Sequence, residues 1–272
     1  MTDHLERPAD ALFTERTPRV VSASKLLRAA ARRKAGRFLA EGANAVESAL
    51  ETGVVVEVFA TVEGARRYGG RVGDDPTLVT DRAMRSLSET VTPPGVVAVC
   101  RLLDAESVPN DARLVSVPVD IADPGNAGTL VRVSDAVGAD AVVLAGEAVD
   151  PHNGKCVRAS AGSIFHLPIV RSRDTAAAIG DLHMRGLTVL AAAGDGEIDL
   201  DDADDLLARP TAWLFGNEAH GLTADVQALA DHRVRIPIRG RAESLNLATA
   251  ASICLYASSR ALHRGSSPGP DA

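Results

Sequence analysis

In the second half of the chain, continuous apolar runs alternate with segments of helical periodicity. The apolar runs predict buried strands over residues 114–121, 139–145, 166–170, 187–193, 211–216 and 234–238. The periodic segments predict helices over residues 126–138, 174–186, 222–231 and 244–262. Strands that are apolar on both faces and alternate with helices indicate a parallel sheet covered on both sides. We therefore predict an α/β fold.

The first half is less regular. Its apolar spacing predicts helix from about residue 22 to 50, and strands over 54–62 and 95–103. Asp81 is expected to be the N-cap of a short helix between these strands. The polar stretch 104–113 is typical of a linker. The expected organisation is a flexible tail 1–15, a first domain 16–105, a linker 106–113, a second domain 114–262 and a flexible tail 263–272.

The composition is that of a globular protein, because 46% of the 272 residues are hydrophobic and 24% are charged. Only 3% are aromatic, which argues against an RNA-binding sheet built on base stacking. Cys100, Cys156 and Cys254 are too widely spaced to indicate a disulfide framework or a zinc ribbon. No apolar run approaches the length of a membrane span and no signal peptide is evident, so we expect a cytoplasmic protein.

One basic segment contrasts with an acidic chain. The net charge is −7, yet eight basic residues and no acid lie between Arg16 and Arg37, so the remainder carries −15. Such a stripe is typical of a surface that contacts the phosphate backbone of a nucleic acid. The alternative is the solvated face of an amphipathic helix. The candidate phosphate contacts are Lys25, Arg28, Arg32, Arg33, Lys34 and Arg37.

No metal site is expected. The acidic run 195–205 has Leu200 and Leu206 where an EF-hand needs glycine and glutamate, so it does not predict calcium binding. His152 and Cys156 lie four residues apart, but no second pair accompanies them. We interpret them as a chance surface pair.

Three loop-to-helix junctions carry candidate chemistry, and each follows a predicted strand. They are residues 123–128, residues 215–222, and residues 236–246, in which Ser244 and Asn246 open the last predicted helix. Taken singly, each is also explained as a tight turn or, at Ser244, as a helix N-cap. The carboxyl ends of parallel strands meet at one edge of a sheet, where ligands bind, so together the junctions predict a site. Neither GxGxxG nor GxxxxGK[ST] is present, so a Rossmann dinucleotide site and a P-loop are not supported.

These junctions resemble the three sequence motifs of the SpoU (TrmH) family of RNA 2′-O-ribose methyltransferases, in the SPOUT superfamily. DPGNAGTLVRVSDAVGADAVVL is similar to the first motif, LFGNEAHGL to the second and IPIRGRAESLNLATAASICLY to the third. VRASAGSIFHLPI is similar to a further family segment. Upstream, KLLRAAARRKAGRFLAEGANAVESAL resembles the small α/β RNA-binding domain often fused in front. The resemblance extends from about residue 20 to 262.

The resemblance implies a SPOUT parallel sheet with a deep trefoil knot, S-adenosylmethionine bound in that knot, and a homodimer formed through the knotted domain. By matching motif positions, the cofactor contacts would be Phe215, Gly216, Asn217, Ile236, Ile238 and Leu245. The catalytic positions would be Asn126, Arg132, Glu218, Ser244 and Asn246.

The implied reaction is attack of a ribose hydroxyl on the sulfonium methyl, which needs alignment of the two groups and removal of the hydroxyl proton. A guanidinium is not readily deprotonated, so we expect Arg132 to hold the adjacent phosphate or to stabilise negative charge on oxygen. Glu218 is a chemically easier proton acceptor, or it orients Asn126 or Arg132.

The substrate must be RNA, because DNA lacks the 2′-hydroxyl. The fused upstream domain favours 23S ribosomal RNA over tRNA, on fold-level analogy. The alternatives are a tRNA 2′-O-methyltransferase and a noncatalytic RNA-binding or ribosome-assembly factor that keeps the fold. A small-molecule enzyme on a generic α/β sheet is a further alternative, against which the basic stripe argues.

Overall fold

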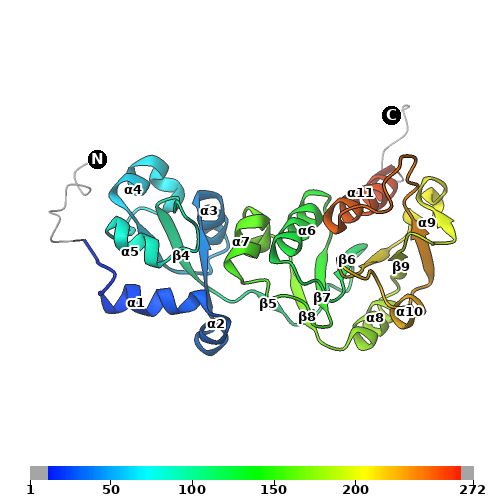
Figure 1. The fold of residues 1–272 in the computed structure, drawn as a ribbon, viewed down its shortest axis with the longest axis horizontal. Helices are drawn as coiled ribbons and strands as arrows, with labels where there is room; N and C mark the ends of the chain where they lie inside the picture. Colours follow the sequence, from blue (N-terminus) through cyan, green and yellow to red (C-terminus); the bar gives the residue numbers. More distant parts are fainter. Residues whose placement is uncertain (1–11, 265–272) are drawn as a thin grey trace. The chain divides into compact units, whose positions relative to one another are not determined.

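The computed structural model describes residues 12–264, which form two compact units. Of these residues, the first unit contains 12–103 together with 150–166, and the second contains 104–149 together with 167–264. Figure 1 shows the helices and strands of both units, coloured along the sequence. Each unit has its own β-sheet, so we describe them separately.

The first unit is a four-stranded sheet with short helices. Its strands lie in the order β1-β4-β2-β3, with β4 antiparallel to both of its neighbours and β3 parallel to β2. Its strands are β1 (Arg37–Glu41), β2 (Val55–Ala60), β3 (Thr77–Leu78) and β4 (Val96–Arg101). Its α-helices are α1 (Pro18–Ser24), α2 (Ala29–Ala35), α3 (Ala43–Glu51), α4 (Val62–Tyr68), α5 (Asp81–Ser86) and α7 (Gly154–Ser160). Its 3₁₀ helices are η2 (Lys25–Leu27), η3 (Gly69–Val72) and η4 (Ser163–Phe165).

The predicted helix over residues 22–50 is wrong in its middle, where β1 lies. The helix α2 ends at Gly36, whose φ of 63° is a left-handed conformation that glycine adopts without strain. The next residues form β1, which pairs with β4 and has every residue after Arg37 buried. Long-range pairing with β4 therefore overrides a local pattern that reads as helix.

The second unit is an eight-stranded sheet in the order β10-β12-β9-β11-β6-β7-β8-β5, with every neighbouring pair parallel. Its strands are β5 (Asp104–Ala105), β6 (Leu114–Pro118), β7 (Ala141–Ala145), β8 (Ile169–Ser172), β9 (Thr188–Ala192), β10 (Ile198–Asp199), β11 (Thr211–Phe215) and β12 (His232–Arg235). Its helices are α6 (Pro124–Ala136), α8 (Thr175–Met184), η5 (Leu200–Asp202), α9 (Asp204–Leu207), α10 (Ala224–Gln227) and α11 (Leu247–Arg264). This confirms the predicted parallel α/β sheet.

Helices cover both faces of this sheet. In Figure 1, α6 and α11 lie on one side of the strands and α8 and α10 on the other. On the α11 side, the buried indole of Trp213 in β11 donates a hydrogen bond from Nε1 to Ser258 Oγ at 2.8 Å. On the α8 side, Ile179 and Leu182 pack against the apolar residues of the central strands. Both faces of the strands are buried, which explains their continuous apolar sequences.

The structure differs from the expected domain boundaries in two places. The expected linker is not free, because β5 pairs with β8 and the side chains of Val108 and Ala112 are buried in the core of the second unit. Residues 150–166, expected within the second domain, belong to the first unit. There Phe165 stacks on Phe38 at 5.9 Å between ring centroids.

Three smaller differences concern chain ends and a helix cap. Phe13 was expected in a tail, but it forms a β-bridge with Val79 and packs on the core of the first unit. His263 and Arg264 complete α11, while the remaining tail residues 1–11 and 265–272 lie outside the described residues. The N-cap of α5 is Thr80, whose hydroxyl accepts from the amide of Ala83, and Asp81 is the first helical residue.

Arg32 was expected to contact phosphate, but the structure buries it in the first unit with 4% of its surface exposed. Its guanidinium donates to Asp150 Oδ2 at 2.7 Å from Nη2 and to the carbonyl oxygens of Leu26 and Leu27. Burial alone would raise the pKa of Asp150, but hydrogen bonds from His152 and Arg32 hold it well below its usual value. Arg32 therefore joins the basic segment to residue 150, and it is not available to RNA.

We expect Arg32→Ala to lower the free energy of unfolding by about 2–4 kcal/mol, because it removes the only guanidinium that the structure places against this partly buried carboxylate. Since the pKa of Asp150 is depressed in the folded protein, its contribution is present above about pH 4 and is lost as the pH falls further. Urea unfolding followed by circular dichroism at neutral and acidic pH measures both effects. The control is the exposed neighbour Arg33→Ala, for which a change beyond about 0.5 kcal/mol would contradict this assignment.

Candidate active site

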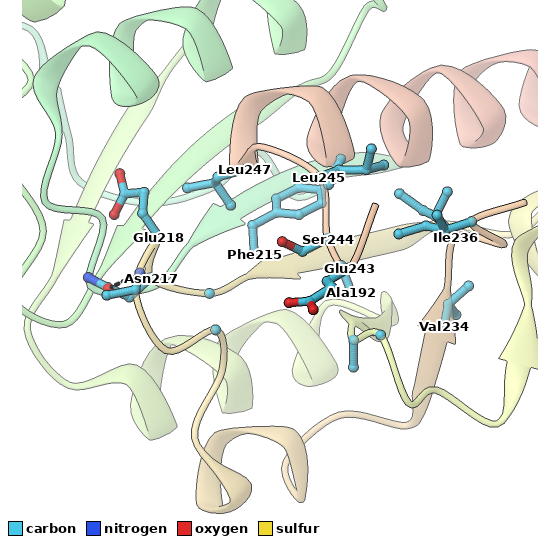
Figure 2. A pocket seen from close by; sticks show the side chains of 17 residues that line it. Ala192, Phe215, Asn217, Glu218, Val234, Ile236, Glu243, Ser244, Leu245 and Leu247 are labelled. Atoms are coloured by element: carbon cyan, nitrogen blue, oxygen red, sulfur yellow. Dashed lines mark hydrogen bonds between the residues drawn. The ribbon is translucent and has the colours of Figure 1, made fainter. Parts of the chain in front are cut away.

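A pocket of about 340 Å³ lies at the carboxyl edge of the sheet in the second unit. Its walls come from the ends of β9, β11 and β12, from the loop 236–246 and from the first turns of α11. Figure 2 shows Asn217 and Glu218 at one end and Val234 and Ile236 at the other. The six residues expected to contact a cofactor all line this pocket: Phe215, Gly216, Asn217, Ile236, Ile238 and Leu245. Two of the three junctions thus meet in one cavity, as the topology of a parallel sheet predicts.

Part of the pocket wall was not predicted. Ala192 ends β9 and Ala193 and Gly194 follow it, and Val234 and Glu243 also line the cavity. The available signal was the run of small residues at the end of a predicted strand, which lets the main chain approach a ligand closely. A small-residue run is common enough that the sequence alone did not single it out.

Glycine is required at position 216 because the following hairpin packs directly against it. The next residues form a tight hairpin in which Asn217 and Gly221 exchange backbone hydrogen bonds of 3.1 and 2.8 Å. This hairpin returns so close to Gly216 that a Cβ atom there would overlap the backbone of Gly221 and Leu222. The glycine therefore closes the hairpin that forms one wall of the pocket.

Glu218 connects this hairpin to the first junction. Its carboxylate accepts from the amides of Ala122 and Asp123 at 3.3 and 3.2 Å and from Asn126 Nδ2 at 3.1 Å. Partial burial would raise the pKa of Glu218, but these bonds and its own backbone amide outweigh that effect and hold the pKa below its usual value. Glu218 is therefore an ionised acceptor that positions other groups, and a weak base.

Asn246 ends the chain of polar contacts that begins at Glu218. Its Nδ2 donates to Asn126 Oδ1 at 3.4 Å, and its Oδ1 accepts from the amides of Ala248 and Thr249 at 2.9 and 3.3 Å. Asn246 is thus the residue that caps α11, in place of Ser244. Ser244 instead lines the pocket. Asn126, Glu218 and Asn246 come from three separate segments, and the fold places them in one hydrogen-bonded row.

Arg132 lies apart from this row. It follows Asn126 by six residues on α6, a rotation of about 240° around the helix axis. Its side chain is exposed, does not line the pocket and makes no hydrogen bond or ion pair with any residue of the described range 12–264. The structure thus brings four of the five predicted catalytic residues to the pocket or its edge and leaves Arg132 as an unpaired surface cation.

The charge of the pocket is negative. Its lining residues include Glu218 and Glu243 and no lysine, arginine or histidine. The lining also includes apolar side chains such as Phe215, Leu245 and Leu247 (Figure 2). An apolar cleft with acidic residues in its lining suits a ligand that has apolar faces and carries a positive charge. No cluster of His, Cys, Asp or Glu suited to a metal is present in residues 12–264, and no helix in that range is long and apolar enough to cross a membrane.

Comparison with known proteins gives matches over both units. The SpoU rRNA Methylase family matches residues 113–256, and the MRM3-like substrate binding domain matches residues 17–98. The chain is 34% identical to the 23S rRNA (guanosine(2553)-2′-O)-methyltransferase RlmP of Bacillus subtilis, over 83% of this chain and 89% of that protein. It is 32% identical to the 23S rRNA (uridine(2479)-2′-O)-methyltransferase of Streptomyces viridochromogenes, over 83% of each chain.

A solved structure extends the likeness to the fold. The SpoU methyltransferase AviRb from Streptomyces viridochromogenes, in complex with the cofactor AdoMet, superposes with a TM-score of 0.78. The superposition covers 92% of this chain and 100% of that one, at 28% sequence identity.

We expect Gly216→Ala to lower the free energy of unfolding by about 1–3 kcal/mol and to increase amide hydrogen exchange in residues 216–222, because the added methyl group forces the hairpin away from β11. The matched control is Gly194→Ala, which lines the same pocket and has open space around the added atom. Equal losses of stability in the two variants would show that the hairpin does not depend on the absence of a side chain at residue 216.

Proposed function

Since this chain belongs to the SpoU rRNA methylase family, we propose that it transfers a methyl group from S-adenosylmethionine to a ribose 2′-hydroxyl of 23S ribosomal RNA. The observation that carries this proposal is the pocket at the carboxyl edge of the sheet, with the row Glu218, Asn126 and Asn246 beside it. The relatives that support the choice of RNA are named for 23S rRNA 2′-O-methylation.

The pocket fits the cofactor in size and in charge. Its volume of about 340 Å³ lies within the range of small-molecule sites. When bound, S-adenosylmethionine supplies a methyl group on a positively charged sulfur. The carboxylate of Glu243 favours a cation in this cavity, and no cation of the lining opposes it. Phe215, Ile236 and Leu245 would hold the apolar faces of the ligand.

The polar row beside the pocket would position the ribose. Asn126 is held by Glu218 on one side and by Asn246 on the other, so its amide is fixed before the substrate arrives. Preorganised polar groups of this kind lower the cost of aligning a nucleophile. Because the pKa of Glu218 is lowered, we assign it the role of orienting Asn126, with Ser244 available as a hydrogen-bonding group inside the pocket.

Arg132 would act on the RNA itself. It has no partner among the described residues, so its guanidinium is available to bind a phosphate next to the target ribose. From that position it also stabilises negative charge on the attacking oxygen. A guanidinium keeps its proton, so proton removal is assigned to solvent or to the RNA.

An exposed apolar face on α11 is a candidate for the interface of a homodimer. Ile253 and Tyr256 lie three residues apart on α11 and expose an apolar face, with Tyr256 65% exposed. We propose that this face forms the homodimer, which leaves less apolar surface in water.

The trefoil knot and the cytoplasmic location stay predictions. In the first unit, the match to a substrate binding domain supports RNA contact by the exposed cations of the basic segment.

We expect Arg132→Ala to lower methyl transfer at least about 100-fold while the affinity for S-adenosylmethionine stays nearly unchanged, because the residue lies outside the pocket. The measurement is transfer of labelled methyl groups to unmodified RNA separated by size, with cofactor binding followed by calorimetry. Equal loss of transfer and of cofactor binding would contradict this division of roles. Label confined to the tRNA band would keep the chemistry and overturn 23S rRNA as the substrate.

We expect Tyr256→Glu to shift the protein from dimer to monomer, because a charge replaces an aromatic ring at the proposed interface. Size-exclusion chromatography with light scattering measures the mass. The matched control is Met184→Glu on α8, which introduces the same charge at a residue that is 82% exposed. If both variants keep the mass of the wild type, the face on α11 is not the interface.

A further inference from the structure

Four cations of the basic segment face one groove in the first unit. This groove has a volume of about 500 Å³ and lies between the helices α1 and α2 and the strands β2 and β4. The cations that line it are Arg19, Lys25, Lys34 and Arg37. Arg28 and Arg33 are equally basic and exposed, but they do not line it. The structure therefore separates the cations that line the groove from those that do not, a distinction that the basic segment did not show in the sequence.

The groove carries uncompensated positive charge. Its one acid, Glu57, forms an ion pair with Arg19 and accepts a hydrogen bond from Thr77. Lys25, Lys34 and Arg37 make no side-chain hydrogen bond or ion pair with any residue that the structure describes. With four cations and one acid, the groove has a net charge of +3. Three unpaired cations around one hollow complement the phosphates of a polyanion.

The floor of the groove is apolar, and a β-bulge exposes its central residue. The pairing of β2 with β4 shifts between Val55 and Glu57, so Val56 has no partner in the ladder. Val56 is consequently 41% exposed, although it lies in a strand. Leu26 and Val99 continue the apolar lining beside it. Bulges re-aim side chains, and this one turns a valine toward the space between the cations.

We propose that this groove binds a backbone segment of the substrate rRNA, with phosphates on Lys25, Lys34 and Arg37 and a ribose or base against Val56. The inference rests on the proposed function, because it takes RNA as the substrate. A strand laid along the groove satisfies its two chemical features together, since a nucleotide joins an anionic phosphate to a largely apolar sugar and ring.

A second groove of the same unit provides the comparison. It is lined by Arg67 and Arg85, together with Glu63 and Asp81, so its charges cancel. Val91 lies on its edge and is 98% exposed. Balanced charge gives no counterion release on RNA binding, which makes this groove a matched negative control.

The test compares two double variants that each remove two positive charges from the first unit, Lys34→Ala with Arg37→Ala and Arg67→Ala with Arg85→Ala. The probe is an unmodified 23S rRNA transcript, bound to the full chain at several salt concentrations. Each lost phosphate contact weakens binding about 5- to 8-fold at 0.1 M salt and lowers the salt slope by about 0.7–0.9. We therefore expect about 25- to 60-fold weaker binding for the first pair and little change for the second.

A second comparison leaves every cation in place. Val56→Glu puts a carboxylate on the floor of the proposed groove, and Val91→Glu puts the same group beside the other groove. We expect only Val56→Glu to weaken rRNA binding, with both variants keeping the circular dichroism spectrum and the cofactor affinity of the wild type.

The outcomes separate this inference from the proposed function. If the wild type binds rRNA and the Arg67 and Arg85 pair loses more affinity than the Lys34 and Arg37 pair, the groove is wrongly assigned while the methyltransferase proposal stands. If Val91→Glu and Val56→Glu weaken binding equally, the assignment is likewise overturned. If the wild type binds S-adenosylmethionine but no rRNA, then rRNA is the wrong substrate, and the proposed groove is overturned together with it.

Discussion

The hydrogen bonds of the Glu218 carboxylate join two loops of the site, and the arrangement of the site depends on them. This carboxylate accepts hydrogen bonds from the loop after β6 and from Asn126, and it stands on the hairpin that follows β11. These two strands are neighbours in a parallel sheet, so their carboxyl ends are about one strand spacing apart. A charged acceptor shared by both loops fixes their relative positions more strongly than neutral hydrogen bonds would. The donors in turn keep the carboxylate ionised, which suits it to orient neighbours and makes it a poor base.

The two units carry opposite local charges. The pocket of the second unit is lined by two glutamates and no cation, whereas the groove of the first unit has four cations and one acid. A cationic cofactor and an anionic substrate would each meet a complementary surface, while the net charge of −7 describes neither. Bulk charge is an average over surfaces with separate tasks, so it is a poor guide to the partners of such a protein.

Buried side chains of the first unit show how a charged residue can be structural. Arg32 and Arg33 are adjacent in the sequence and chemically alike, yet one is buried against Asp150 and the other is exposed. The helical rotation of about 100° per residue separates their directions. Asp150 lies 118 residues further along the chain, and the fold places its carboxylate beside Arg32. That carboxylate makes it favourable for the cationic side chain of Arg32 to point into the protein. Charge counting along the segment gives both residues equal weight.

The sequence by itself determined the parallel α/β sheet and the segments that form the pocket, because buried strands and loop glycines have strong local signatures. Gly216, Ile236 and Leu245 were expected from the resemblance to the family's motifs, and they line one cavity. Tertiary structure alone decided features that depend on distant partners. The strand β1 exists through pairing with β4, residues 150–166 pack in the first unit, and Asn246 caps α11, a role for which Ser244 was the alternative considered from the sequence. In each case the free energy comes from contacts between residues far apart in the chain, and local periodicity contains no information about them.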